Sequence, residues 1–293
     1  MKKLLLASTA LVGFAGAAAA EVALSGYAEI GIKGGTGMET QFHNDIDVTF
    51  SMSGETDNGL QFGATIDLDE VNASAEVGGT GTTNLSSVWV SGEFGKVTLG
   101  DTDGAFDWAM KETSKLTSIA DDHSTHAGFS GNGGLDGTYD GQVMRYEYAM
   151  DAISFAVSAE LDDTGAGDPV FGIGFKWSGD MGGTTVGVGI GHQTVSGGAD
   201  ITGISLDASM AGGFYGILNY SDHSVTGSHT GVALGYNTGA LTAEVNYGEF
   251  EAGGEGYGLA VNYDMGGGAV AMLGYGKTNG GGSTWSAGLG LSF

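Results

Sequence analysis

The chain of 293 residues contains no cysteine, which excludes disulfide frameworks, cysteine-ligated zinc sites and thiol nucleophiles. Basic residues are also scarce, because nine Lys and Arg stand against 35 Asp and Glu, for a formal net charge of -26. Phosphate binding needs a basic face, so nucleic acid is a poor candidate partner. Cations are what such a surface attracts.

Proline occurs once, whereas glycine occurs 58 times, far above its usual share of about 7%. Neither a Gly-X-Y period nor a Ser/Pro-rich linker accounts for this glycine. Glycine can instead lie where strands pack closely, bend or turn. The apolar share of 41% argues against a disordered chain.

Long apolar runs are missing beyond residue 20, where no segment approaches the roughly 20 residues of a membrane-spanning helix. The first residues, MKKLLLASTALVGFAGAAAA, combine Lys2 and Lys3 with a short apolar run and an Ala-x-Ala ending. This pattern predicts a secretory signal peptide over residues 1–20, cleaved before Glu21. A membrane anchor that is not cleaved is the alternative, although the apolar run is short for it.

From Glu21 onward, apolar residues recur at every second position, which is the pattern of a strand with one apolar face. About sixteen such segments follow, each of about eight to eleven residues, the length that crosses a bilayer at a tilt. The pattern predicts an all-β fold, a transmembrane antiparallel up-and-down β-barrel over residues 21–293, most simply of sixteen strands.

The connections between these segments alternate in length. Short ones such as GEFG and AGG take turns with longer polar ones such as GGTGMETQ, TVSGGAD and SDHSVTGS. Short turns at one end and long loops at the other are typical of outer-membrane barrels. A soluble β-sandwich or β-solenoid is the alternative, since alternating strands also suit a sandwich. The charged polar face, and the aromatic residues near the ends of the apolar face, favour a wet lumen and a lipid-facing surface.

Several stretches resemble the general porins of Gram-negative outer membranes, in particular the alphaproteobacterial branch. The similar stretches are EVALSGYAEIG, FSMSGETDNGLQFGATIDLDE, VWVSGEFGKVTLGD and GQVMRYEYAMDAISFAVSAELDD. The resemblance implies a sixteen-stranded barrel, a homotrimer, and passive diffusion of small hydrophilic solutes across the outer membrane. It also implies a long third loop folded into the lumen as a constriction, which falls here at residues 101–141.

This loop is rich in acids, and rings of carboxylates select cations. We expect the acidic constriction to be formed by Asp101, Asp103, Asp107, Glu112, Asp121 and Asp122. The alternative is that these acids lie on a surface loop and are simply hydrated, as is usual for runs of charged residues. The position of the loop in the resembling family favours the constriction.

Porins of this kind usually oppose the acidic loop with several arginines on the wall, whereas this chain holds a single arginine, Arg145. Arg145 and Glu147 share one face of a predicted strand, so Arg145 is the candidate basic residue opposite the acids. A salt bridge to Glu147 is its alternative role. The candidate wall residues are Arg145, Glu147, Lys33, Asp45, Asp47 and Asp67.

No cofactor is required by this interpretation, although one calcium site is a candidate. The stretch GNGGLDG resembles a single turn of a calcium-binding repeat, and one copy cannot build the repeat's solenoid. A single Ca²⁺ held by Asp136 and Asp140 is one interpretation, and solvated carboxylates are the other. His123 and His126 form an H-x-x-H pair, but no third ligand is fixed by spacing, so histidines without a metal are favoured.

The sequence contains no Gly-x-Ser-x-Gly element, and no other positioned catalytic set stands out, so we predict that the protein is not an enzyme. Its expected partners are outer-membrane lipid, lipopolysaccharide, further copies of itself, small solutes and cations. A structural or adhesive barrel with an acidic rim that binds divalent ions, and with little conductance, is the alternative function.

The final stretch, WSAGLGLSF, fits a closing strand whose apolar residues face lipid and whose Ser and Gly residues face the lumen. A terminal Phe293 resembles the signal that the barrel-assembly machinery recognises in porins. We also expect the new amino terminus at Glu21 to meet Phe293 in one seam.

Deleting Phe293 is expected to lower the amount of assembled barrel before it alters the conductance of the barrels that do form. Heat-resistant migration of membrane extracts on gels measures the first quantity, and planar-bilayer recording measures the second. Unchanged assembly of the shortened chain would show that Phe293 is not an assembly signal.

Overall fold

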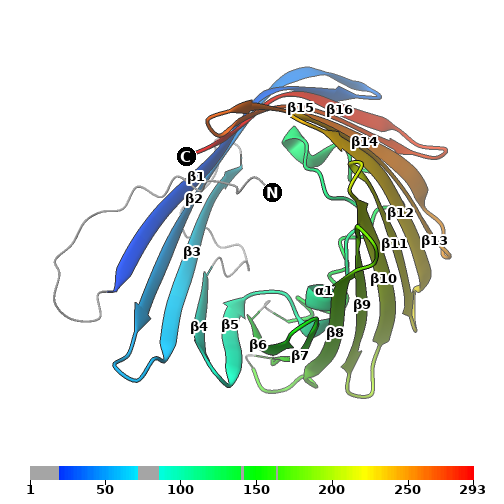
Figure 1. Ribbon diagram of the computed structural model, residues 1–293. Coiled ribbons are helices and arrows are strands. Elements are labelled where there is room, and N and C mark those ends of the chain that lie inside the picture. Colours follow the sequence, from blue (N-terminus) through cyan, green and yellow to red (C-terminus); the bar gives the residue numbers. More distant parts are fainter. Residues whose placement is uncertain (1–19, 72–85, 140–141, 163) are drawn as a thin grey trace.

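The computed structural model describes residues 20–71, 86–139, 142–162 and 164–293. These residues form sixteen antiparallel strands, each paired with its neighbours along the chain, and β1 pairs with β16 to close the barrel (Figure 1). The strands are β1 (Glu21–Gly35), β2 (Met38–Glu55), β3 (Gln61–Val71), β4 (Ser86–Gly92), β5 (Gly95–Asp101), β6 (Gln142–Met150), β7 (Ile153–Glu160), β8 (Val170–Asp180), β9 (Thr184–Val195), β10 (Asp200–Met210), β11 (Phe214–His223), β12 (Gly227–Thr238), β13 (Leu241–Phe250), β14 (Glu255–Gly266), β15 (Ala269–Thr278) and β16 (Ser283–Ser292). The predicted sixteen-stranded barrel is confirmed. The predicted signal peptide lies almost wholly outside the described residues.

The seam between β1 and β16 differs from the expected one. The Phe293 N–H donates to the Gly26 carbonyl at 2.9 Å, whereas Glu21 pairs with Ser53 of β2. The expectation that Glu21 meets Phe293 is therefore wrong. Closing a barrel requires a stagger between its strands, so β1 extends past the end of β16.

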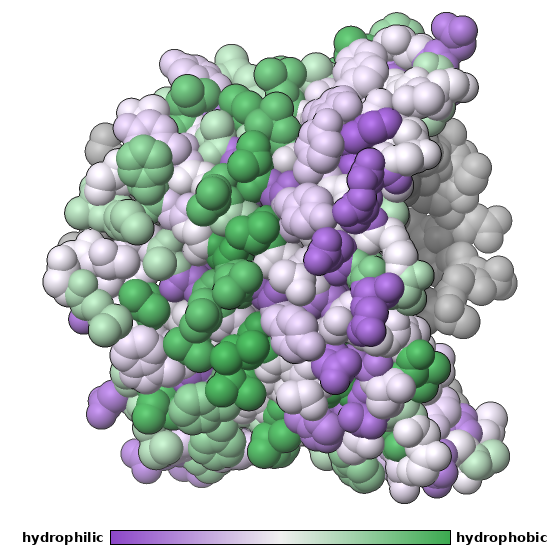
Figure 2. Space-filling model, turned by 90° about the vertical axis from the view of Figure 1, so that its right-hand side faces the viewer, coloured by the Kyte–Doolittle hydropathy of each residue, from purple (hydrophilic) through white to green (hydrophobic). Residues whose placement is uncertain are grey.

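The wall is apolar on the outside and polar on the inside. Leu206, Leu218 and Leu234 are among the large hydrophobic side chains exposed on the outer face. Figure 2 shows a band of hydrophobic residues crossing this face from top to bottom, with hydrophilic residues gathered along one side. Inward positions carry buried polar residues such as Ser205 and Asn219. A soluble sandwich would bury its apolar faces between two sheets, so this inverted arrangement favours the membrane barrel.

One end of the barrel carries only short turns in the described residues, at 56–60, 93–94, 151–152, 181–183, 211–213, 239–240 and 267–268. We call it the short-turn end. At the other end, the expectation of long loops is wrong for five connections. The strands β1 and β2, β9 and β10, β11 and β12, β13 and β14, and β15 and β16 join through residues 36–37, 196–199, 224–226, 251–254 and 279–282. Polar residues there continue the strands. These polar residues show where a strand extends beyond the apolar, lipid-facing band of the barrel. They do not show where its hydrogen bonds to the neighbouring strands end.

The long segment between β5 and β6 folds into the barrel, as predicted. We call its described part, residues 102–139, the lumen loop; it contains α1 (Ala105–Ala109) and a 3-10 turn, η1 (Ile119–Asp121). Figure 1 shows α1 inside the barrel beside β8. No helix in the described ranges is long and apolar enough to cross a membrane.

Inward polar side chains hold the lumen loop strand by strand. From β7 round to β1, the bonds are Ala105 N–H to Ser158 Oγ (2.8 Å), Lys111 N–H to Ser205 Oγ (2.9 Å), Asn262 Nδ2 to the Thr117 carbonyl (3.0 Å), Ser286 Oγ to the Ile119 carbonyl (2.5 Å) and Ala120 N–H to Glu29 Oε2 (3.1 Å). The loop therefore lines the wall from β7 to β1, and the inward faces of β2 to β4 lie across the barrel from it.

Glycines make this close approach possible. A Cβ at Gly174 would lie 2.1 Å from the Ala105 carbonyl oxygen, and one at Gly258 would lie 1.7 Å from that of His123. Real Cβ atoms do not approach backbone oxygen so closely, so the loop rests directly on the wall backbone. Part of the high glycine content is therefore explained by wall positions where the backbone of the lumen loop lies directly against the strands.

Replacing Gly258 by Ala is expected to lower the free energy of unfolding of the barrel in detergent by about 1–3 kcal/mol, the usual cost of overpacking, and therefore to lower its melting temperature. The matched control is Gly216→Ala, because the nearest atom to a Cβ there is the flexible Leu234 Cδ2 at 3.2 Å. Unfolding is followed by circular dichroism. Equal melting of the two variants would contradict the contact between loop and wall.

Candidate functional site: the acidic constriction

The lumen loop presents three exposed acids to the interior of the barrel, at Asp103, Glu112 and Asp121, and a partly buried one at Asp107. Asp107 belongs to α1, whose buried residues Ala105, Phe106 and Ala109 pack against the wall. The wall-facing positions of this short helix therefore anchor it. The carboxylate is left on the side toward the lumen.

These acids influence one another, so they share one space. Burial, followed by the charges of Asp103 and Asp121, raises the pKa of Glu112. Because the barrel surrounds these side chains on several sides, they are less hydrated than on an open surface, even where they contact water in the lumen. Repulsion between the carboxylates opposes their ionisation further.

Among the acids of the lumen loop, Asp107 has the most strongly shifted pKa. Burial raises the pKa of Asp107 to about 7, with smaller contributions from neighbouring carboxylates that include Asp103 and Glu112. The guanidinium of Arg145 lowers the pKa of Asp107, but not enough to offset these effects. Asp107 is therefore the loop acid poised to gain or lose a proton near neutral pH.

Asp121 is presented by strained backbone. Ala120 and Asp121 have φ of 55° and 49°, the left-handed region that residues other than glycine rarely adopt. The Ala120 N–H donates to Glu29 Oε2, which also lies 2.9 Å from His43 Nε2. Burial raises the pKa of Asp121; His123 opposes the rise, and Glu29 contributes to it. Strain of this kind persists only when the surroundings hold it, and here it places Asp121 beside the β1 wall.

Asp122 differs from the expectation, Asp101 precedes the lumen loop, and Asp136 belongs to the candidate calcium site. Asp122, next to Asp121, is 4% exposed and does not face the open lumen. Asp101 is exposed at the end of β5. Asp136 accepts the Gly104 N–H at 2.6 Å and also the Gln193 side-chain amide.

The candidate calcium site has little support. Asp136 already accepts two internal hydrogen bonds, and Asp140 lies outside the described residues. Within the described ranges, no group of three or more His, Cys, Asp or Glu side chains is arranged to hold a metal ion.

Three basic side chains near the loop have partners, whereas Lys111 of the loop itself is exposed. Arg145 is 8% exposed; its Nη1 donates to the Asp103 carbonyl at 2.5 Å, and its Nε lies 3.9 Å from Glu147. Arg145 therefore contacts the loop through its backbone and also forms the ion pair with Glu147 that was its alternative role. Lys96 lies 3.8 Å from Glu147, and the ammonium of Lys176 lies 3.8 Å from the Trp108 ring centroid. The Lys176 contact with α1 was not predicted.

The remaining candidate wall residues occupy inward positions of β1, β2 and β3. Lys33 pairs with Ser286, whose side chain bonds the lumen loop, and this register places Lys33 on the lumen side. Asp45 pairs with Glu29, and Asp67 accepts a hydrogen bond from Thr49 Oγ1 at 2.9 Å. Asp47 follows Asp45 on the same face.

Histidines hold the returning half of the loop, a role that the sequence did not reveal. His126 Nε2 lies 2.8 Å from Asn246 Oδ1, and His229 Nε2 donates to the Gly128 carbonyl at 2.9 Å. Burial lowers the pKa of both His123 and His126, which favours their neutral forms. The strand period places His229 and Asn246 on the lumen side. It does not say which loop atoms they bond.

The lumen loop therefore narrows the interior of the barrel and exposes acids there, while Arg145 is paired with Glu147. Carboxylates at close quarters attract cations and repel anions. Acids exposed inside a barrel therefore have the means to bias which ions enter it.

Comparisons with known proteins bear on this arrangement. A family model described as "Gram-negative porin" matches residues 7–280. A porin of Rhodobacter capsulatus is 32% identical over 158 residues, which are 50% of this chain and 47% of the relative. The matched region thus spans about half the length of this curated relative.

Solved structures agree on the fold. A triple mutant of the Rhodopseudomonas blastica porin matches with a TM-score of 0.76 and 20% identity, covering 93% of this chain and 100% of that chain. Another mutant of the same porin matches with a TM-score of 0.75 and 21% identity, at the same coverage. At these identities, the likeness supports the barrel architecture alone.

Asp107→Asn is expected to raise the melting temperature in detergent at about pH 8, and to do so much less at about pH 5. The folded-state pKa of Asp107, about 7, lies above the ordinary 3.8, so the folded protein binds the proton more tightly. Wild-type stability therefore falls as pH rises from about 4 to 7, and Asn removes this loss. A pH-independent difference between the two proteins would contradict the raised pKa.

Proposed function

The chain belongs to the Gram-negative porin family, and from this we propose that it is a passive diffusion channel of the outer membrane. Small hydrophilic solutes and ions are its proposed cargo, with a preference for cations. The barrel would set the largest solute that passes, and the lumen loop would narrow that limit.

One observation carries the cation preference. Asp103, Glu112 and Asp121 are exposed inside the barrel, whereas Arg145 is buried against the loop backbone and Glu147. Three exposed acids, with the one arginine paired to Glu147, outweigh the exposed loop lysines Lys111 and Lys115 and leave a negative potential in the passage. Such a potential enriches cations and depletes anions where the passage is narrow.

We propose three further properties that rest on family membership. The protein forms a homotrimer, reaches the outer membrane through the signal peptide at 1–20, and is recognised at Phe293 by the barrel-assembly machinery. The apolar band of Figure 2 supports contact with lipid, and lipopolysaccharide is the proposed lipid partner at the rim.

The decisive test is recording of purified protein in a planar bilayer with a KCl gradient. Stepwise conductance with a cation-biased reversal potential supports the proposal. A silent bilayer with well-folded protein contradicts it, and would favour a structural or adhesive barrel.

Neutralising two lumen acids together, Glu112→Gln with Asp121→Asn, is expected to reduce the cation-to-anion permeability ratio. A unit charge about 4 Å from an ion in water contributes about 1 kcal/mol, so each removed charge should lower the cation permeability by up to about five-fold and raise that of anions. Single-channel conductance in concentrated salt should change less, because high salt screens the removed charges.

The matched control is Glu93→Gln with Asp151→Asn, which removes the same two charges from exposed short turns. It should leave the permeability ratio nearly unchanged. Equal effects of the two double variants would show that overall charge, and not the constriction, sets the preference.

A further inference from the structure

A buried carboxylate on the barrel wall binds the lumen loop next to its acids. Glu244, on β13, is 2% exposed and faces inward. Its Oε1 accepts the Ser114 hydroxyl at 2.5 Å, and its Oε2 accepts the Lys115 N–H at 2.9 Å. This attachment lies between Glu112 and Asp121, the two exposed acids of the central part of the loop.

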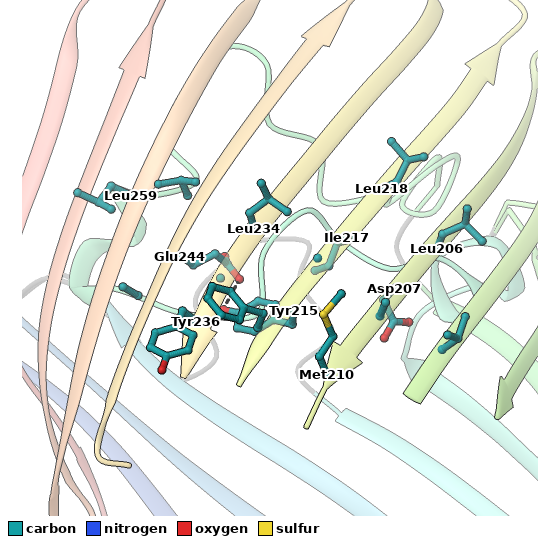
Figure 3. A pocket seen from close by; sticks show the side chains of 17 residues that line it. Leu206, Asp207, Met210, Tyr215, Ile217, Leu218, Leu234, Tyr236, Glu244 and Leu259 are labelled. Atoms are coloured by element: carbon teal, nitrogen blue, oxygen red, sulfur yellow. Dashed lines mark hydrogen bonds between the residues drawn. The ribbon is translucent and has the colours of Figure 1, made fainter. Parts of the chain in front are cut away.

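A second wall residue completes the attachment. The Tyr215 hydroxyl, from β11, donates to Glu244 Oε2 at 2.7 Å, and Figure 3 shows this bond. The two residues belong to strands separated by β12, and Gly235 pairs with both of them. A Cβ at Gly235 would lie 2.0 Å from Tyr215 Cζ, so only glycine there lets the ring reach Glu244.

The same wall segment also removes a positive charge from the passage. The Lys115 ammonium lies 4.8 Å from the Tyr215 ring centroid, 3.9 Å from Asp207 Oδ2 and 3.0 Å from Ser209 Oγ. Lys115 is therefore held against β10 and β11, where an acid and an aromatic face offset its charge. Because Asp207 and the Tyr215 ring offset its charge, Lys115 weakens the effect of the loop acids on ions less than a lysine without such partners would.

Glu244 and the loop depend on each other energetically. A buried carboxylate is costly unless hydrogen bonds satisfy it, and here the Ser114 hydroxyl and the Lys115 N–H, two of its three donors, come from the loop. If this part of the loop lifted, Glu244 would lose most of its partners at once. The attached loop position is therefore favoured strongly over intermediate ones.

We propose that Glu244, supported by Tyr215 across Gly235, is the positioning residue that fixes the width and charge of the constriction. It acts on ions through the loop rather than by contact, since its own carboxylate is closed off from the lumen. The proposal rests on the proposed channel function and assigns a residue of the wall, outside the loop, to it.

The test compares Glu244→Ala with Glu244→Gln in planar bilayers, using the full-length protein. Glu244→Ala removes the acceptors, so we expect loss of the steady open level, larger open-channel noise and a shift of the reversal potential toward zero. Glu244→Gln should behave as wild type, because its amide oxygen accepts the loop donors and its amide N–H can donate to the Tyr215 oxygen. The matched control is Glu249→Ala, an exposed acid on the same strand.

The outcomes separate clearly. Wild-type behaviour of Glu244→Ala overturns the proposal, and so does a Glu244→Gln variant as noisy as Glu244→Ala, because charge and not hydrogen bonding would then matter. If Glu244→Ala fails to assemble, Tyr215→Phe removes one donor only, and a quiet channel from that variant also overturns it. A wild type without cation preference refutes the proposed selectivity, whereas the noise of Glu244→Ala still tests the positioning role.

Discussion

The closure of the sheet by β1 and β16 is the constraint on which the rest of the structure depends. Hydrocarbon offers no hydrogen-bond partners, so every backbone N–H and C=O within it must be paired inside the protein, and a closed sheet achieves this without edges. Closure also creates an interior. Because side chains alternate along each strand, an apolar exterior requires that this interior be lined by the other half of the residues, which here are mostly polar or glycine, with some buried apolar residues such as Ile201 and Ile217.

A polar interior changes how a loop can be held inside a protein. Only a small apolar cluster, which includes Phe106 and Met110, fixes the α1 part of the lumen loop. The remainder rests on glycine backbone and on inward Ser, Asn, His and Glu side chains. Such bonds are directional, and each buried group that lost its partner would be costly, so together they specify one loop position more sharply than apolar packing would.

Much of the fold could be predicted from the sequence. In a strand, alternate residues face opposite sides, so the apolar positions show directly which residues face outward. The lumen loop was predictable in its location but not in its contacts. Asp121 and Asp122 are neighbours of the same type, and left-handed backbone at Ala120 and Asp121 presents one of them while burying the other. The partner of a loop atom depends on the stagger of sixteen strands, which no local pattern contains. The same stagger explains why Phe293 meets Gly26 and not Glu21.

Charge selection in this barrel follows from pairing rather than from the number of acids. Acids outnumber bases throughout the chain, yet many lie on rims and turns where salt screens them. Inside the barrel, Arg145 and Lys96 share Glu147, and Lys115 lies beside Asp207, so these three positive charges are offset by wall acids. Burial, with a smaller contribution from repulsion by neighbouring loop acids, raises the pKa of Asp107 to about 7, even though Arg145 opposes the rise. Repulsion between the loop acids destabilises the folded barrel. A cation that passes between these acids reduces this repulsion, and for that reason the acids attract it.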